Sequence, residues 1–176
     1  AGLSGRRTRE RLASCERDVL GIDGLIISHD HSDHVRNAGV LHRMFELPLH
    51  MTTPTLQKSR GRLGNLRSTI SFQAGDTLAF GDLTVETIPT PHDAADGTAF
   101  VVCAGTRRLG ILTDLGHPFP ELTEVLPTLD AVFMESNYDP DMLENGPYPA
   151  FLKDRIRGPA GHISNIEAAR LLDQHT

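Results

Sequence analysis

The sequence has no tryptophan, and its aromatic residues make up only 5% of 176 positions, so aliphatic side chains must fill the core. Two cysteines, Cys15 and Cys103, are too few for a disulfide framework and form no paired metal motif. They fit a reducing cytosol, where we expect both to be small buried residues. We find no run long enough for a membrane span and no signal-peptide pattern, which favours a cytoplasmic location.

Positive charge is also scarce, with 17 Lys and Arg against 23 Asp and Glu and a formal net charge of -6. This balance excludes a dense basic coat that binds duplex DNA by displacing counterions. It does not exclude a nucleic-acid substrate, because bound metal ions add positive charge that a residue count omits. The length and composition are typical of one globular domain, which we expect to span residues 1–176.

Histidine is abundant, with nine residues, and four metal-ligating side chains gather in one heptapeptide, Ser28–His34. The pattern is H-x-H-x-D-H. His29 and His31 are two residues apart on an extended segment, so their side chains point to the same side and can coordinate one metal ion. Asp33 and His34, on the turn beyond, can grip a second. Imidazole and carboxylate ligands suit Zn²⁺ or Mn²⁺. The alternative is a solvated polar loop.

Apolar runs and turn residues predict strands that alternate with helices, which indicates an α/β fold. Ser4 is expected to cap the first helix, Thr53 the third, and a capping box of Ser164 and Glu167 opens the last. We expect strands at 24–28, 47–51, 83–88, 99–103, 109–113 and 129–134, and helices at 6–15, 35–45, from 53 onward, at 119–126 and from 164 onward. The apolar helix positions expected to face the core are Val40, Leu41 and Met44, and later Ile166, Ala169 and Leu172.

Two further candidate ligands follow strands. His92 lies in the stiff segment Pro89–Asp93, and Asp114 lies at the end of a strand, where a carboxylate can bridge two metals. Each alone is more typical of an ordinary loop residue. Their order after the histidine cluster gives them weight.

The order of these ligands resembles the metallo-β-lactamase superfamily, which shows H-x-H-x-D-H, a later lone His and then a bridging Asp. The resemblance implies an αββα sandwich with the metal site at one edge of two packed sheets. Several blocks resemble the YycJ/WalJ branch of that superfamily. They are Ala1-Gly2-Leu3-Ser4, His31-Ser32-Asp33-His34, Pro91-His92-Asp93-Ala94-Ala95-Asp96, Thr113-Asp114-Leu115-Gly116, Met134-Glu135-Ser136-Asn137 and Gly161-His162-Ile163-Ser164-Asn165.

This branch implies an exonuclease-like phosphodiesterase that acts on DNA rather than RNA, with two divalent metal ions, Zn or Mn. By position, His29, His31 and His92 would bind one metal. Asp33 and His34 would bind the other, and Asp114 would bridge them. A metal-activated hydroxide would then attack the phosphodiester bond. Asp33 is therefore expected to be needed for catalysis as well as for metal binding.

His162 lies in a context similar to the motif that opens a helix in related RNA-processing nucleases. There the histidine serves the phosphate or the leaving group, so we expect a catalytic role for His162, with metal ligation and a structural role as alternatives. The last metal-binding histidine of those nucleases follows one more strand, so we expect the domain to be incomplete at both termini. Residues expected to support the ligands from nearby are Asp93, Asp96, His117 and Asn137.

Three questions stay open. After Asn137 the branch usually has His, and here Tyr138 stands instead, which puts specificity in doubt. Alternatives to a nuclease are a hydrolase of another ester, a thioester, a lactone or a β-lactam on the same fold, and a non-catalytic metal-binding fragment. The basic stretch of Lys58, Arg60, Arg62 and Arg67 can contact a phosphate backbone or simply form a solvated helix face.

Overall fold

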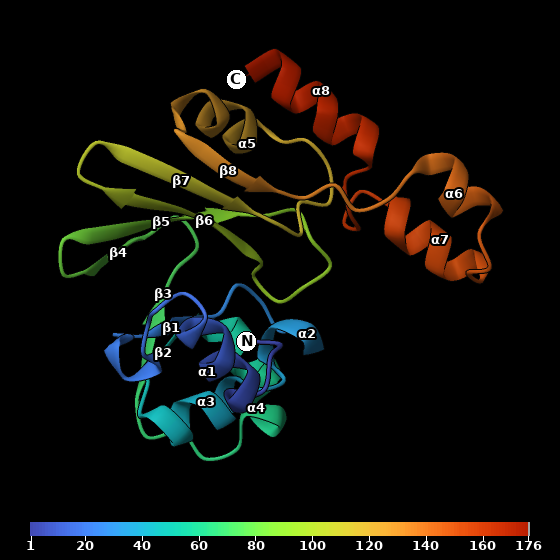
Figure 1. The fold of residues 1–176 in the computed structure, drawn as a ribbon. Helices are drawn as coiled ribbons and strands as arrows, with labels where there is room; N and C mark the ends of the chain where they lie inside the picture. Colours follow the sequence, from blue (N-terminus) through green and yellow to red (C-terminus); the bar gives the residue numbers. More distant parts are fainter. Residues whose placement is uncertain (176) are drawn as a thin grey trace. The chain divides into compact units, whose positions relative to one another are not determined.

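The computed structural model describes residues 1–175 and contains two β-sheets, each with its own helices (Figure 1). The sheets belong to two compact units. Unit 1 comprises Ala1–Gln73 and Ala94–Asp96, and unit 2 comprises the rest of the chain. The mixed α/β class predicted from the sequence is confirmed. The grouping of residues 1–176 into one domain stays a prediction.

Unit 1 is built on a three-stranded parallel sheet in the order β1-β2-β3. The central strand is buried at all four positions, as a strand covered on both faces must be. Its core contains Ile27, Leu49, Met51 and Leu63. The strands are β1 (Leu25–Ile26), β2 (Leu49–Thr52) and β3 (Thr69–Phe72), and the helices are α1 (Gly5–Ala13), α2 (Ser32–Val35), α3 (Ala38–Phe45) and α4 (Thr53–Leu63), with a 3-10 turn at Val19–Gly21.

The helix expected at 35–45 is in fact two helices, α2 and α3, separated at Arg36 and Asn37. Asn37 leaves the helical conformation, and its backbone N–H and side-chain amide donate to the carbonyls of Ala1 and Gly2. The break changes which side of α3 packs against the core. Ala38 and Leu41 are buried, whereas Val40 and Met44, which were expected there, are exposed.

Two smaller expectations in unit 1 are also wrong. Thr52, not Thr53, caps α4, because its hydroxyl accepts the backbone N–H of Thr55 at 3.4 Å. Cys15 is exposed just beyond the end of α1 rather than buried. The cap expected at Ser4 is confirmed, since its hydroxyl accepts from Arg7 N.

Unit 2 is built on a five-stranded sheet in the order β4-β5-β6-β7-β8. All pairs are antiparallel except β7 with β8. Leu122, Leu126 and Leu171 bring α5, the following 3-10 turn and α8 into the same core as the sheet (Figure 1). The strands are β4 (Thr77–Phe80), β5 (Leu83–Pro89), β6 (Thr98–Ala104), β7 (Arg107–Leu112) and β8 (Ala131–Met134), the helices are α5 (Pro120–Val125) and α8 (Asn165–His175), and the 3-10 turn is Leu126–Thr128.

Helix α8 opens with the predicted capping box. Ser164 accepts from Glu167 N at 3.2 Å, and the Glu167 carboxylate accepts from Ser164 N at 2.8 Å. The buried positions are Ala168 and Leu171, whereas Ile166 and Ala169 are exposed, so the expected apolar phase was displaced.

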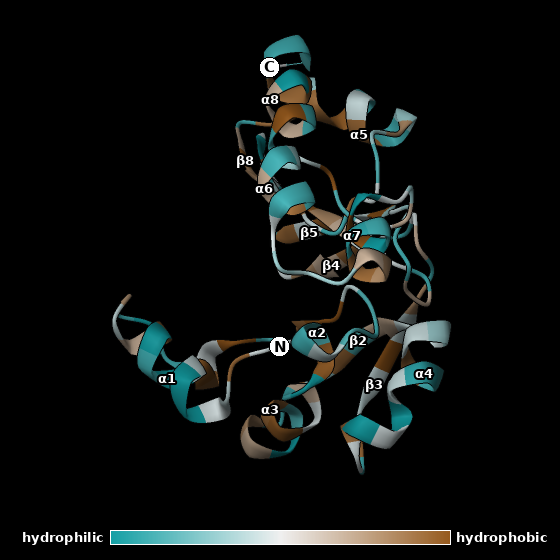
Figure 2. Ribbon diagram, turned by 90° about the vertical axis from the view of Figure 1, so that its right-hand side faces the viewer, coloured by the Kyte–Doolittle hydropathy of each residue, from teal (hydrophilic) through white to brown (hydrophobic). Residues whose placement is uncertain are grey.

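Two helices that the sequence did not predict, α6 (Pro140–Asn145) and α7 (Ala150–Arg157), lie between β8 and α8. Figure 2 shows α6 as mainly hydrophilic, and α7 has no buried residue. The Asp139 carboxylate caps α6 by accepting from Met142 N at 2.9 Å. Both helices are short, with six and eight residues, so an apolar period repeats too few times to predict them. No helix within residues 1–175 is long and apolar enough to cross a membrane.

An ion pair in unit 2 gives a prediction about acid stability. Arg108 on β7 reaches past β6 to Glu86 on β5, with nitrogen–oxygen distances of 2.7 and 2.8 Å. These hydrogen bonds hold the pKa of the Glu86 carboxyl below its ordinary value of 4.5, against the opposing effect of burial. The ionised pair therefore stabilises the fold above that pH and ceases to do so as pH falls through the lower pKa of the folded state.

We expect Glu86→Gln to make the free energy of unfolding fall less steeply with acid below about pH 4.5. The effect should be under about 1 kcal/mol, because the pair is partly exposed and solvent screens it. Urea titrations at a series of pH values measure it. Asp173→Asn, on the exposed side of α8, is the control and should leave the pH dependence unchanged. A Glu86→Gln protein with the same acid dependence as the unaltered protein would contradict the prediction.

Candidate metal centre and active site

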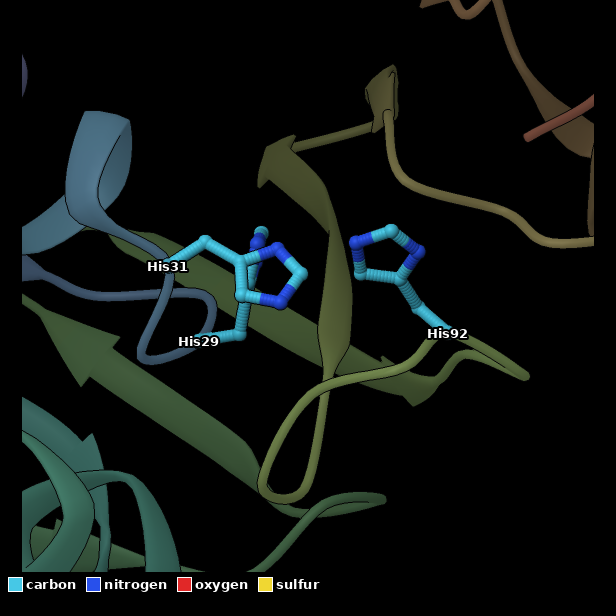
Figure 3. A group of neighbouring side chains, drawn as sticks. All are labelled: His29, His31 and His92. Atoms are coloured by element: carbon cyan, nitrogen blue, oxygen red, sulfur yellow. The ribbon is translucent and has the colours of Figure 1, made fainter. Parts of the chain in front are cut away.

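Four candidate ligands in unit 1 come from one short segment. The chain leaves β1 through buried Ile27, and His31 occupies the N-cap position of α2. His29 and His31 project from the same loop (Figure 3), with ring centroids 4.7 Å apart and planes at 81°. Asp33 and His34 belong to the first turn of α2, and the His34 ring lies 4.0 Å from that of His29. The extended-then-helical backbone thus gathers all four predicted side chains.

The Ser28 hydroxyl orients two of these imidazoles. Its oxygen lies 3.1 Å from His29 Nδ1 and 2.9 Å from His34 Nδ1, so its two lone pairs can accept an Nδ1–H from each ring. A histidine held through Nδ1 presents Nε2 as its ligand atom. Ser28 therefore selects the nitrogen that each ring offers.

The Asp33 carboxyl is held ionised. Burial favours its neutral form, but a backbone hydrogen bond and the nearby His34, His29 and His31 outweigh burial and lower its pKa. A carboxylate that stays charged is suited to a divalent cation.

Asp30, which the sequence analysis passed over, is a buried anchor inside the histidine motif. Its carboxylate accepts from Ala95 N at 2.7 Å, and its carbonyl accepts from Arg62 at 3.0 Å. Residues alternate sides along an extended segment, so Asp30 points away from its histidine neighbours. This alternation is the feature of the sequence that could have indicated a structural role for Asp30. Arg62 of the basic stretch thus has a structural partner.

His92 in unit 2 follows β5 and is oriented by the backbone (Figure 3). Its Nδ1–H donates to the Gly161 carbonyl at 2.8 Å. That bond fixes the tautomer that leaves Nε2 as the ligand atom, and Nε2 lies 3.7 Å from Asp114 Oδ1.

Asp114 follows β7 and has a φ of 60°, an uncommon conformation for a residue with a side chain. Two residues later, Gly116 has a φ of 66° and lies against the carbonyls of Pro91 and Pro159. Between them, Leu115 N donates to Glu135 at 2.9 Å. This tight turn directs the Asp114 carboxylate toward His92.

Glu135 and His162 form a hydrogen-bonded pair next to these residues. Glu135 follows β8, is buried, and accepts from His162 Nδ1 through a short contact. Hydrogen bonding to Glu135 raises the pKa of His162 above its ordinary value of 6.5, opposed by burial and assisted by the charges of Glu135, Asp114 and Asp93. Ligand-capable atoms of His92, Asp114 and His162 lie within 4.8 Å of one another. Three predicted residues from distant parts of unit 2 therefore converge.

Glu135 was missed as a site residue. The only signal was its place directly after a strand, in the block Met134–Asn137, of which only Asn137 was selected. The structure has Asn137 Nδ2 3.4 Å from Glu135 Oε1.

The other expected supporting residues differ in what they contact. Asp93 forms an ion pair with Arg155, with a closest distance of 2.5 Å, and its backbone N–H donates to Ala160 O at 2.8 Å. His117 Nδ1 donates to Pro159 O at 2.6 Å. Both thus tie the loops around His92 and Asp114 to residues 158–161. Asp96 is exposed and belongs to unit 1.

The close approach at Gly116 leads to a prediction. A Cβ there would lie 1.7 Å from Pro91 O and 2.8 Å from Pro159 O, both rigid backbone atoms. Gly105, in the turn between β6 and β7, has a similar φ of 59° but has nothing within 4 Å. We expect Gly105→Ala to cost about 1–2 kcal/mol from backbone strain alone. Gly116→Ala should cost about 1–3 kcal/mol more from the clash.

Denaturant unfolding of both variants measures the difference, because the shared positive φ cancels between them. Equal destabilisation would show that the turn does not need this close contact.

Comparison with known proteins begins with a family model described as "Beta-lactamase superfamily domain", which matches residues 1–175. Exodeoxyribonuclease YycJ of Bacillus anthracis is 34% identical over 171 residues, which cover 96% of this chain and 65% of that protein. Exodeoxyribonuclease WalJ of Streptococcus pneumoniae (serotype 2, strain D39) is 31% identical over 177 residues, which cover 98% of this chain and 65% of that protein. This chain thus spans just under two thirds of the length of these curated relatives.

Solved structures give the fold independently. Zn²⁺-bound PqqB from Methylobacterium extorquens matches with a TM-score of 0.67 at 16% identity, over 88% of this chain and 56% of that one. The metallo-β-lactamase fold protein YhfI from Bacillus subtilis matches with a TM-score of 0.65 at 20% identity, over 87% and 60%. The predicted metallo-β-lactamase fold is confirmed. Together with the His and Asp clusters, this fold indicates divalent metal binding.

Proposed function

Since the chain belongs to the beta-lactamase superfamily domain family, we propose that it is a di-metal hydrolase of phosphodiester bonds, and specifically a DNA exonuclease. Two relatives above 30% identity carry the name exodeoxyribonuclease, which favours DNA over RNA. The observation that carries the proposal is the Glu135–His162 pair beside Asp114 and His92, because a histidine with a raised pKa next to candidate metal ligands suits phosphodiester cleavage. Residues 1–176 would form most of one such domain, and the cytosolic location remains part of the proposal.

The proposed ligand set divides between two metal ions. His29, His31 and His92 bind one ion, Asp33 and His34 bind the other, and Asp114 bridges. The donors fit, because His92 offers Nε2 after donating through Nδ1, and Asp33 is held ionised. Nitrogen and oxygen donors of this kind suit Zn or Mn. Bound divalent ions would neutralise charge on the phosphoryl oxygens and lower the pKa of water at the site.

In this proposal His162 donates a proton to the oxygen that leaves phosphorus. Its Nδ1 is held by Glu135, so Nε2 is the atom that can give the proton. Glu135 is itself fixed, since its other oxygen accepts from Leu115 N. Hydrogen bonding to Glu135 raises the pKa of His162, which favours the protonated form that a general acid requires. The same bond leaves His162 Nε2 available to a metal ion as well, so metal ligation by His162 stays the alternative that substitution must test.

A substrate panel tests the function directly. Metal-loaded protein is incubated with end-labelled single- and double-stranded DNA and RNA, and separately with a thioester and a lactone, and metal content is measured on the same sample. We expect a ladder of shortened DNA products that disappears when a chelator removes the metal. A protein that holds metal but cleaves thioesters or lactones and not DNA would support the rival hydrolase. Bound metal with no hydrolysis would support a metal-binding fragment.

Separate substitutions distinguish ligands from the proton donor. His162→Gln should keep the metal content and lower kcat about 10²- to 10⁴-fold, which is the usual contribution of general acid catalysis. His92→Ala should lose bound metal together with activity. Elemental analysis and single-turnover kinetics on the two proteins measure this. Loss of metal from His162→Gln would make His162 a ligand instead.

A further inference from the structure

A cavity of about 540 Å³ opens between the end of β8, the N-terminus of α8 and the α6–α7 segment. Its size is in the range of small-ligand sites in proteins. Tyr138 and Tyr148, which line it, are the only two tyrosines in the chain. The other lining residues are Ser136, Asn137, Asp139, Met142, Leu143, Gly146, Pro147 and Asn165. We call this space the tyrosine cavity.

The lining combines flat apolar surface with amide groups. Tyr148 is 52% exposed and Met142 is 75% exposed, so their apolar surfaces are open to a ligand. Ser136 donates to Asn165 Oδ1 at 2.7 Å, which fixes the orientation of that amide at the rim and leaves its Nδ2 to donate elsewhere. Aromatic faces with neighbouring amides suit a planar ligand that has hydrogen-bonding edges.

The charged groups around the tyrosine cavity already have partners. Asp139 caps α6, and Arg157 on α7 pairs with Glu144 and Asp154 at 2.7 and 2.6 Å. Burial, the largest influence, raises the pKa of the Tyr138 phenol, so that phenol stays neutral. The cavity therefore favours an uncharged group over a free phosphate.

Asn137 connects the tyrosine cavity to the catalytic pair inside unit 2. Its side chain lines the cavity and lies 3.4 Å from Glu135 Oε1. Its backbone N–H donates to the carbonyl of Ile163, the residue after His162, at 3.1 Å. A group bound in the cavity would therefore lie against Ser136 and Asn137, the two residues that directly follow Glu135 in the chain.

We propose that the tyrosine cavity binds the base of an unpaired nucleotide next to the scissile phosphate, stacked on Tyr148 and hydrogen-bonded by the rim amides. The inference rests on the proposed nuclease function and narrows its substrate to a strand with an unpaired end. A base must be out of the duplex stack before it can stack on a protein ring, and an unpaired base reaches that state without the cost of unpairing. Tyr138, which stands where the related branch usually has His, would line the space that the base occupies.

The composition of the chain provides a direct probe. There is no tryptophan, so intrinsic fluorescence comes from Tyr138 and Tyr148 alone. A short single-stranded oligodeoxynucleotide is titrated with chelator present to prevent cleavage, and free tyrosinamide corrects for light absorbed by the DNA. We expect saturable quenching by the normal strand. An abasic strand of equal length should bind at least about fivefold more weakly, because it lacks the stacking bases.

Substitutions at the ring locate the contact. Their affinities are measured by fluorescence anisotropy of a dye-labelled strand, because each substitution of Tyr148 removes one of the two tyrosine fluorophores. Tyr148→Ala should weaken binding of the normal strand about fivefold to 150-fold, the range expected for loss of one base–aromatic stack. Tyr148→Phe keeps the ring and should bind within about twofold of the unaltered protein. Phe151→Ala removes an aromatic side chain on α7 that is 74% exposed and does not line the cavity, and it should have no effect. Thermal unfolding checks that each variant is folded.

The outcomes separate the inference from the function on which it rests. Equal binding of normal and abasic strands, or an unchanged affinity in folded Tyr148→Ala, would overturn the cavity assignment even if DNA is cleaved. Binding that depends on bases and on Tyr148, in a protein that cleaves no DNA when loaded with metal, would keep the cavity assignment and overturn the nuclease function. Base-dependent binding together with a raised KM for DNA cleavage in Tyr148→Ala supports both.

Discussion

The Glu135 carboxylate joins three segments of unit 2 that are far apart in the sequence. It accepts from the backbone of Leu115 beyond β7, from His162 before α8 and from Asn137 in its own loop. A buried carboxylate is tolerated only when its oxygens are satisfied, and removing one partner of such a network typically costs about 3–5 kcal/mol. The arrangement of Asp114 and His162 thus depends on Glu135, which is not itself a candidate metal ligand.

Backbone carbonyls provide the second constraint on unit 2. Within residues 158–161, three successive carbonyls accept hydrogen bonds from His117, from the backbone of Asp93 and from His92. The ion pair between Asp93 and Arg155 connects α7 to the same region. Helix α7 has no buried residue, so this ion pair, rather than packing in the core, helps to fix its position.

Unit 1 achieves its geometry by local means. One extended stretch that runs into a helical turn is enough to gather His29, His31, Asp33 and His34, and Ser28 orients two of the rings. Asp30 also reaches beyond this segment, to Ala95 and Arg62. The two clusters therefore have opposite origins, one in consecutive residues and one in long-range hydrogen bonds.

This difference explains how much the sequence could predict. The α/β class, most strands, the capping box at Ser164 and the superfamily all follow from short-range patterns, because periodicity, turn chemistry and motif spacing act within a few residues. The same is true of the candidate ligands in the H-x-H-x-D-H segment. The faces of α3 and α8 were mispredicted, because a break at Asn37 and packing against the sheet decide which side is buried. Helices α6 and α7 were missed because they are only six and eight residues long, so an apolar period repeats too few times to be detected.

What the sequence alone determined is therefore the set of candidate metal ligands and the family to which their order belongs. Tertiary structure decided which residues hold them. Glu135, Asp30 and the carbonyls of residues 158–161 carry no local signature, since their roles depend on partners between 20 and 69 positions away. Folding brings those partners together. Only then does His162 acquire the neighbours that its proposed role as a proton donor requires, and only then does Tyr138 come to line a cavity.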